Sequence, residues 1–188
     1  MKETAFQLIA EGGISNLTMS ALAKRSGYST AIVGYHFGSK NNFIQHLVDD
    51  LFEQNISTMT DPLVRDDFAK EIPLLFSNVA KYVEENRATV GAYLTLLSSA
   101  NESNPALLKI VQHQNQRVIK TLEAVIKKAQ SRGKANRNVS ANALAISIIG
   151  LIRGVTMQAM VDSQLSVNAA LSTMADGVVA LLGGKQND

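Results

Sequence analysis

Residues 17–40 read LTMSALAKRSGYSTAIVGYHFGSK and contain two short helical segments on either side of a glycine. Thr18 and Ser29 precede the segments MSALAKRS and TAIVGYHF, where their side-chain oxygens can accept the first free N–H groups of a helix. Gly27 stands between the segments, where a turn that needs a positive φ favours glycine. The stretch therefore predicts a helix-turn-helix.

The packing requirements of such a motif are also met. Ala23 is small and stands where the two helices would cross, and Ile32 and Val33 are available to pack back from the second helix. The outer face then consists of residues free to enter the major groove of DNA: Thr30, Ala31, Gly34 and Tyr35. An ordinary helical hairpin is the alternative interpretation, since alanine and glycine are common residues.

Helical patterns continue on both sides of this motif. A first helix is predicted from about Lys2 to Glu11 and ends at Gly12-Gly13. Gly38-Ser39 can end the segment TAIVGYHF and cap a fourth helix, whose apolar residues continue at helical spacing to Phe52. Longer helices are predicted at about 65–86, with Pro73 at a kink or a late start, and then at 88–100, 104–132, 140–163 and 167–182. The predicted fold class is all-α.

The composition is typical of a folded globular protein. Of the 188 residues, 46% are hydrophobic and 18% are charged, so we expect a globular core. The absence of cysteine excludes disulfides and thiolate metal sites and suits a reducing cytosol. Acidic residues within the first apolar stretch argue against a signal peptide. The apolar stretch 141–161 is interrupted by Arg153, so we expect no membrane span.

Charge is distributed in blocks although the net charge is only +2. Residues 1–48 are mildly basic, residues 49–102 are acidic, and residues 103–153 carry nine lysines and arginines against the single acid Glu123. Such blocks are typical of solvated helix faces. A mildly basic head above an acidic body would also orient the head toward phosphate.

The run LTMSALAKRSGYSTAIVGYHFGSKNNFIQHLV resembles the DNA-binding head of the tetracycline-repressor (TetR) family. Residues that match the family in order and spacing are Leu17-Thr18, Leu22-Ala23, Gly27, Ser29, His36-Phe37 and Ser39-Lys40. The resemblance implies a three-helix helix-turn-helix head at 1–46 and a larger helical ligand-binding and dimerisation body at 47–188. It implies a cytoplasmic homodimer, formed through the helices at about 140–163 and 167–182, that binds double-stranded DNA at a pseudo-palindromic operator.

The resemblance also implies roles for individual residues. Thr18, Tyr35, His36 and Lys40 should contact phosphates and Thr30 and Ala31 should face bases, while Ser29 and Gly34 complete the predicted interface. For Lys40 the sequence itself supports the same role. Ser39 and Lys40 begin a helix, and the backbone N–H groups of a helix N-terminus can bind a phosphate together with a cation. A solvated lysine and a packed turn histidine are the alternatives for Lys40 and His36.

Two features depart from the family's pattern. The family usually places a phosphate-contacting tyrosine where this chain has Gly34, and the adjacent Tyr35 points about 100° away on a helix. The basic arm often found ahead of the first helix is also missing. Both departures concern contacts to the DNA backbone.

Candidate ligand-binding residues lie on apolar helix faces. In the helix near 104–132, Asn115 falls inside a stripe formed by Leu108, Val111, Val118, Leu122, Val125 and Ala129. A buried amide needs hydrogen-bond partners, and either a ligand cavity or a neighbouring helix can supply them. Asn78, Tyr93 and Met157 are further candidates, each with an ordinary core residue as the alternative.

No catalytic or metal site is predicted. His46 lies at helical spacing from Asp49, Asp50 and Glu53, but no second histidine or thiolate accompanies it, so a solvated face is the favoured interpretation. No nucleophile is paired with a base, and we expect neither a cofactor nor an enzyme.

The predicted function is a transcriptional regulator, most often a repressor in this family, released from its operator by a small-molecule effector. Gly150 and Gly154 would let a partner helix approach closely, which favours a dimer. Two alternatives remain: a DNA-binding protein that acts without an effector or as an activator, and a helical binding dimer that has lost DNA binding.

Overall fold

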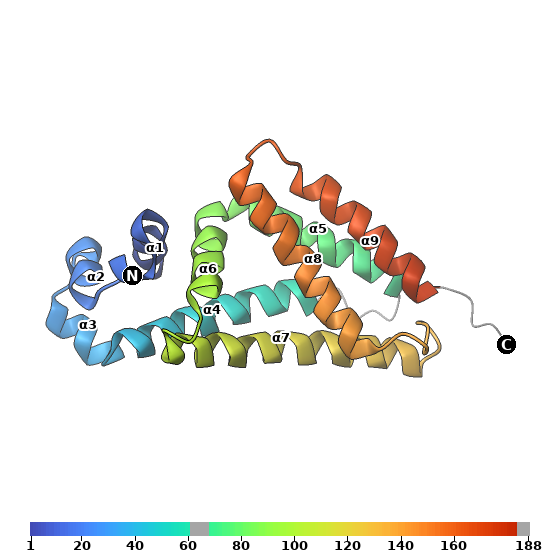
Figure 1. Ribbon diagram of the computed structural model, residues 1–188, viewed down its shortest axis with the longest axis horizontal. Coiled ribbons are helices and arrows are strands. Elements are labelled where there is room, and N and C mark those ends of the chain that lie inside the picture. Colours follow the sequence, from blue (N-terminus) through green and yellow to red (C-terminus); the bar gives the residue numbers. More distant parts are fainter. Residues whose placement is uncertain (61–67, 184–188) are drawn as a thin grey trace. The chain divides into compact units, whose positions relative to one another are not determined.

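The computed structural model describes residues 1–60 and 68–183, all of whose regular elements are helices. In chain order the helices are α1 Lys2–Asn16, α2 Met19–Ser26, α3 Thr30–Phe37, α4 Lys40–Thr60, α5 Phe68–Glu85, α6 Arg87–Ser99, α7 Pro105–Ser131, α8 Ala141–Val161 and α9 Val167–Gly183 (Figure 1). Every predicted helix has a counterpart, so the all-α prediction is confirmed. The first residues of the helix predicted at 65–86, numbers 65–67, lie outside the described residues.

The helix that the sequence predicts to end at Gly12-Gly13 is interrupted there and then continues. Gly12 has φ −157° and ψ 26°, and Gly13 has φ 70° and ψ −170°, after which a short helical piece continues to Asn16. The positive φ of Gly13 is a conformation that glycine adopts without a steric penalty. Pro73 lies inside α5 rather than at its start.

Two compact units divide the chain. The first unit consists of Met1–Glu53 and Asn86–Asn115, and thus joins the three N-terminal helices and most of α4 to α6 and the first part of α7. Within it α1 packs along α6 (Figure 1). Its shared core includes Phe6, Ile9, Leu22, Val33, Phe43, Leu47, Leu96 and Leu107. The helix-turn-helix is therefore held by residues 86–115 as well as by its own three helices.

The second unit consists of Gln54–Glu85 and Gln116–Asp188. In this unit α9 packs against both α5 and α8. Its buried apolar residues include Ile72, Leu75, Phe76, Ile126, Ala145, Ile148, Leu171 and Ala175. Asn142 of α8 donates a 2.9 Å hydrogen bond to Glu123 of α7, which also pairs with Lys127.

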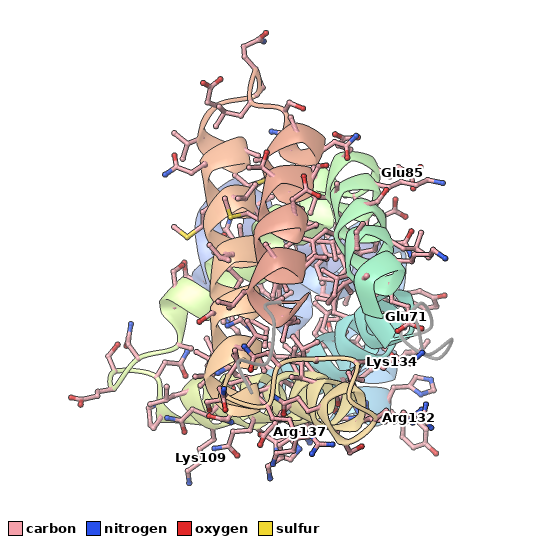
Figure 2. All side chains as sticks on the ribbon, turned by 90° about the vertical axis from the view of Figure 1, so that its right-hand side faces the viewer. Glu71, Glu85, Lys109, Arg132, Lys134 and Arg137 are labelled. Carbon is pink, nitrogen blue, oxygen red and sulfur yellow. The ribbon has the colours of Figure 1, made fainter. Side chains whose placement is uncertain are left out.

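The end of α7 carries a group of cations. Arg132, Lys134 and Arg137 follow the last turns of α7 (Figure 2). The guanidinium of Arg137 donates to the backbone carbonyls of Gln130 at 2.9 Å and of Ser131 at 3.2 Å. Cations there complement the negative end of the helix dipole and satisfy carbonyls that have no partner within the helix. Part of the basic character of residues 103–153 therefore has a structural role.

The buried face of α7 differs from the predicted stripe by about one residue in its first half. Leu107, Ile110 and Gln114 are buried, whereas Leu108 and Asn115 are half-buried. Both adjacent faces of this helix are apolar, so spacing alone did not distinguish them. The buried amide is Gln114, which donates a hydrogen bond to Asp49 of α4.

Among the described helices, α8 has the length and hydropathy of a membrane span, with a mean hydropathy of 1.7 over an 18-residue window. Core helices of water-soluble proteins meet the same criterion. In this chain α8 buries Leu144, Ile148 and Ile152 within the second unit.

Candidate functional site

The turn between α2 and α3 has the geometry that the sequence predicts. Gly27 adopts φ 76° and ψ 12°, and both its N–H and that of Tyr28 are directed to the carbonyl of Ala23. Ala23 and Val33 are buried within the head. The predicted left-handed glycine and the small residue at the helix crossing are thus confirmed.

Both predicted N-caps are confirmed. The hydroxyl of Thr18 accepts a hydrogen bond from the N–H of Ala21 at 3.0 Å, and that of Ser29 accepts from Ile32 at 3.2 Å. A hydroxyl that accepts through one lone pair keeps its own proton for donation. Thr18 and Ser29 are both exposed, so each can cap its helix and still donate to a phosphate oxygen.

Of the two apolar residues available to pack back from α3, one is buried and the other is exposed. Val33 is fully buried and Ile32 is 45% exposed, so Val33 is the apolar residue that packs back. A helix turns about 100° per residue, and the rotation of α3 places Val33 in the core and Ile32 outside it. The exposed residues of α3 are Thr30, Ala31, Ile32, Tyr35 and His36.

Tyr35 and His36 form the exposed end of a row of rings. Tyr35 is 88% exposed, and its ring meets the edge of His36 at 5.7 Å between centroids. His36 is 6.3 Å from Phe37, which packs against Phe43 at 4.7 Å. His36 is therefore neighboured by packed rings and still accessible, which is compatible with a contact to DNA.

The side chain of Lys40 is oriented by the end of α1. Its ammonium donates a 2.6 Å hydrogen bond to the backbone carbonyl of Ile14, and partial burial lowers its pKa below the ordinary value. Ser39 caps the same helix by accepting from the N–H of Asn42 at 3.1 Å. Lys40 thus lies at the start of α4, and its ammonium is directed to the end of α1.

Two other cations of the head, Lys2 and Arg25, are engaged in ion pairs. Lys2 pairs with Asp50, and the guanidinium of Arg25 makes two hydrogen bonds of 2.5 and 2.6 Å to Glu11. The hydrogen bond from Arg25 lowers the pKa of Glu11. The described part of the head therefore offers few cations to the phosphate backbone, chiefly the exposed Lys24 and the half-buried Lys40.

Gly34 leaves open space on α3. A Cβ atom built at this position would meet no atom within 4 Å, and Gly34 lies inside a regular helical turn. The protein itself therefore has room for a side chain where the family usually places a tyrosine.

The acidic group around His46 is engaged in packing. His46 contacts the ring of Phe37 at 5.8 Å between centroids, and Asp49 accepts hydrogen bonds from Gln45 and from the buried Gln114. The side chain of Glu53 lies outside the described part of the chain. Within the described residues, no group of three or more potential metal ligands is gathered.

The four candidate ligand residues belong to two different units. Tyr93 and the half-buried Asn115 lie in the first unit, where Tyr93 packs against the core of the head. Asn78 is half-buried on α5 in the second unit. Met157 is 57% exposed on α8, so its side chain does not line an interior cavity of the single chain.

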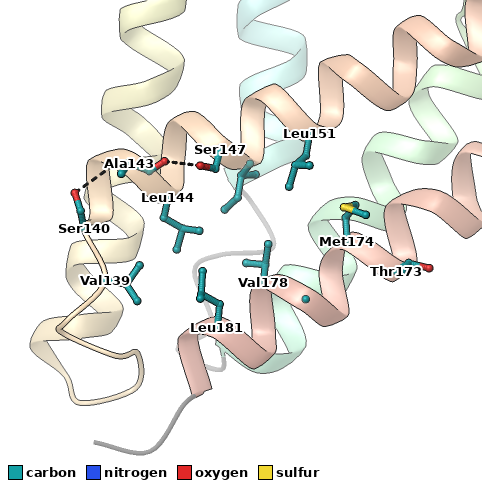
Figure 3. A pocket seen from close by; sticks show the side chains of 12 residues that line it. Val139, Ser140, Ala143, Leu144, Ser147, Leu151, Thr173, Met174, Val178 and Leu181 are labelled. Atoms are coloured by element: carbon teal, nitrogen blue, oxygen red, sulfur yellow. Dashed lines mark hydrogen bonds between the residues drawn. The ribbon is translucent and has the colours of Figure 1, made fainter.

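An open groove of about 430 Å³ runs between α8 and α9 (Figure 3). It is lined chiefly by apolar and small side chains, among them Ala143, Ser147, Leu151, Met174, Gly177 and Leu181. Ser147 directs its hydroxyl to the carbonyl of Ala143 at 2.9 Å, which leaves the groove largely without free polar groups. Ser147 and Gly177 were not singled out by the sequence, although Ser147 lies at helical spacing from the predicted Gly150 and Gly154.

Comparisons with known proteins cover both parts of the chain. Residues 3–47 match the model described as bacterial regulatory proteins of the tetR family, and residues 75–183 match the C-terminal model of BetI-type transcriptional repressors. The HTH-type transcriptional regulator BetI of Burkholderia ambifaria is 28% identical over 191 residues, which cover 96% of this chain and 91% of that protein. BetI of Paraburkholderia phymatum is 28% identical and covers 93% and 87%.

Solved structures share the fold. The fatty acid degradation regulator FadR of Bacillus halodurans aligns with a TM-score of 0.82 at 15% identity, covering 100% of this chain and 95% of that one. FadR of Bacillus subtilis, solved in complex with stearoyl-CoA, aligns with a TM-score of 0.81 at 16% identity and covers 96% of each chain.

Proposed function

Because the chain belongs to the TetR family of bacterial transcriptional regulators, with a C-terminal region of the BetI-type repressors, we propose that it blocks transcription as a homodimer on a pseudo-palindromic operator. Proteins of this family bind DNA operators and small-molecule effectors and form dimers. We further propose that it acts in the cytoplasm, by binding rather than by catalysis.

The observation that carries the DNA-binding proposal is the exposed outer face of α3 beside the α2–Gly27 turn. Thr30 and Ala31 are exposed in its first turn, where recognition helices contact base edges. Tyr35 and His36 follow on its exposed surface, and Thr18, Ser29 and Lys40 lie at helix N-termini, which favour phosphate. These residues, together with Gly34, form the proposed interface. Residues 1–46 form the proposed DNA-binding domain and residues 47–188 the proposed regulatory body.

The proposed dimer face is the exposed side of α8 and α9. Ile146 and Met157 are 50% and 57% exposed on α8, and Leu181 is 52% exposed on α9. Leu181 also lines the groove between the two helices, and a second copy of the chain would cover these apolar side chains. Met157 is better accounted for here than as a ligand contact.

The effector is proposed to contact polar side chains within one of the two units: Tyr93 and Asn115 are the candidates in the first unit, and Asn78 is a separate candidate in the second. Each combines an apolar setting with a group able to hydrogen-bond, as ligand sites in proteins do. Asn78 and Asn115 carry amides and Tyr93 carries a hydroxyl, so an effector bound in either unit would carry polar groups of its own.

Selection of DNA from a random pool by the purified full-length chain tests the proposal. The expected result is a set of sequences with dyad symmetry and half-sites about 10 bp apart or a multiple of it, bound by a dimer. Selected DNA without symmetry would overturn the proposed geometry. An absence of any enriched sequence would support the alternative, a binding dimer that does not recognise DNA.

A further inference from the structure

The exposed surface of α3 lacks the side chains that usually read bases. Its sequence, TAIVGYHF, contains no arginine, lysine, asparagine, glutamine or acid. In the major groove, arginine and lysine recognise guanine, asparagine and glutamine recognise adenine, and carboxylates accept from cytosine. The first turn of α3 offers only the hydroxyl of Thr30 and the apolar side chains of Ala31 and Ile32.

Ile32 is held in an outward orientation. Val33 is fully buried and fixes the rotation of the helix, and the N–H of Ile32 donates to the capping hydroxyl of Ser29. Successive residues of a helix are about 100° apart, so Ala31 lies almost opposite the buried Val33. Ile32 lies between these two directions, next to Ala31 on the exposed surface. Ile32 keeps 45% of its surface exposed although it is a large apolar side chain.

One feature of base pairs in the major groove is apolar, namely the C5 methyl group of thymine. We propose that Ile32, with Ala31 beside it, reads thymine methyl groups, so that each operator half-site contains an A·T pair recognised through its methyl group. The inference rests on the proposed binding of α3 in the major groove. It adds the class of base and names Ile32, which the sequence offered only as one of two residues available to pack back.

Replacement of single thymines by deoxyuridine in the selected operator tests the inference, because it removes the methyl group and keeps the base pair and the phosphates. The free energy of burying one methyl-sized group predicts a loss of about fourfold in affinity at one half-site and about fifteenfold at both. A thymine·adenine pair changed to cytosine·guanine should lose affinity, and 5-methylcytosine at that position should restore part of it.

The variant Ile32→Ala tests whether Ile32 is the side chain that contacts the thymine methyl group. It should lower affinity by roughly tenfold on the thymine operator and abolish the penalty for deoxyuridine at one or more positions. Ile32 is exposed, so the substitution leaves the core unchanged. Lys24→Ala is the matched control, since loss of a cation should weaken both DNAs equally.

The outcomes separate this inference from the proposed function. Sequence-specific binding that is unaffected by deoxyuridine at every thymine overturns the methyl readout and leaves the regulator intact. The methyl readout is equally overturned if Ile32→Ala weakens binding to both DNAs by the same factor. Failure to bind any DNA overturns both.

Discussion

The ammonium of Lys40 donates a 2.6 Å hydrogen bond to the backbone carbonyl of Ile14, just after the two glycines that interrupt α1. An interrupted helix leaves carbonyls without an intrahelical partner, and Lys40 satisfies one of them. The same ammonium is proposed to contact a phosphate. Since it has three N–H donors, the contact to Ile14 leaves two for DNA.

Lys40→Ala should therefore change two properties. Loss of the partly buried hydrogen bond should lower the free energy of unfolding by about 1 kcal/mol. Loss of a phosphate contact should reduce the slope of log K against log salt concentration by about one unit per subunit, on every DNA sequence. Thermal melting and titrations at several salt concentrations measure the two effects. A lower melting temperature with an unchanged slope would make Lys40 a structural residue only.

The wild-type protein should show a shallow salt dependence for a DNA-binding dimer. Lys2 and Arg25 are already paired with Asp50 and Glu11, which leaves Lys24 and Lys40 as the chief cations of the described head. Two cations in each of two subunits neutralise about four phosphates, so we expect a slope of about −4. A slope of roughly −8 would mean that the ion pairs open on DNA or that other cations take part.

The ion pair between Glu11 and Arg25 predicts a dependence of stability on pH. The hydrogen bond from Arg25 lowers the pKa of Glu11 from its ordinary value of 4.5. A carboxyl group whose pKa is lower in the folded state stabilises the fold above its unfolded pKa, and the contribution is lost as pH falls through the folded pKa. Glu11→Gln should thus melt below the wild type at about pH 7, and the difference should vanish in strong acid. A difference that stays constant with pH would contradict this assignment.

In the head, the helix caps and the turn could be predicted from the sequence. Thr18, Ser29 and Gly27 were predictable because capping and left-handed turns depend on the chemistry of a single residue and its immediate neighbours. The family pattern added the order of the helices and the proposed DNA contacts. These features needed no knowledge of distant parts of the chain.

Features that depend on the rotation of a helix were not predictable. Ile32 and Val33 are both apolar and adjacent, and only packing against the rest of the head decides that Val33 is buried. The same holds for Gln114 and Asn115, where the contact to Asp49 on α4 selects Gln114 as the buried amide. The partnership of residues 86–115 with the head also depends on contacts between distant segments.

Gly154→Leu tests the proposed dimer face. In the single chain a Cβ at Gly154 meets no atom within 4 Å, so the position is open, and replacing the glycine raises helix propensity. In a dimer that packs closely on α8, the leucine would hold the partner helix away. We expect sedimentation to show a dimer dissociation constant raised at least about tenfold, which corresponds to about 1.4 kcal/mol.

Ala124→Leu, at an exposed position on α7, is the control for this experiment and should remain a dimer. If Gly154→Leu also remains a dimer and melts at a higher temperature, α8 is free of the partner at this position. The dimer would then have to be formed by another surface.

Gly34 is the position on α3 where the chain departs from its family. Gly34→Tyr should raise operator affinity about tenfold, or roughly 1.4 kcal/mol. Glycine inside a helix costs about 0.5–1 kcal/mol relative to alanine, and a tyrosine hydroxyl that donates to a phosphate contributes about 1.5–3 kcal/mol before side-chain entropy is subtracted. Open space around Gly34 means that the protein itself imposes no clash. Gly34→Ala separates the two contributions, because it restores helix propensity without the hydroxyl and should raise the affinity only a few-fold.

The opposite result would contradict this prediction. If both variants melt at or above the wild-type temperature and yet bind the operator more weakly, a side chain at this position collides with DNA, and Gly34 is itself the point of closest approach.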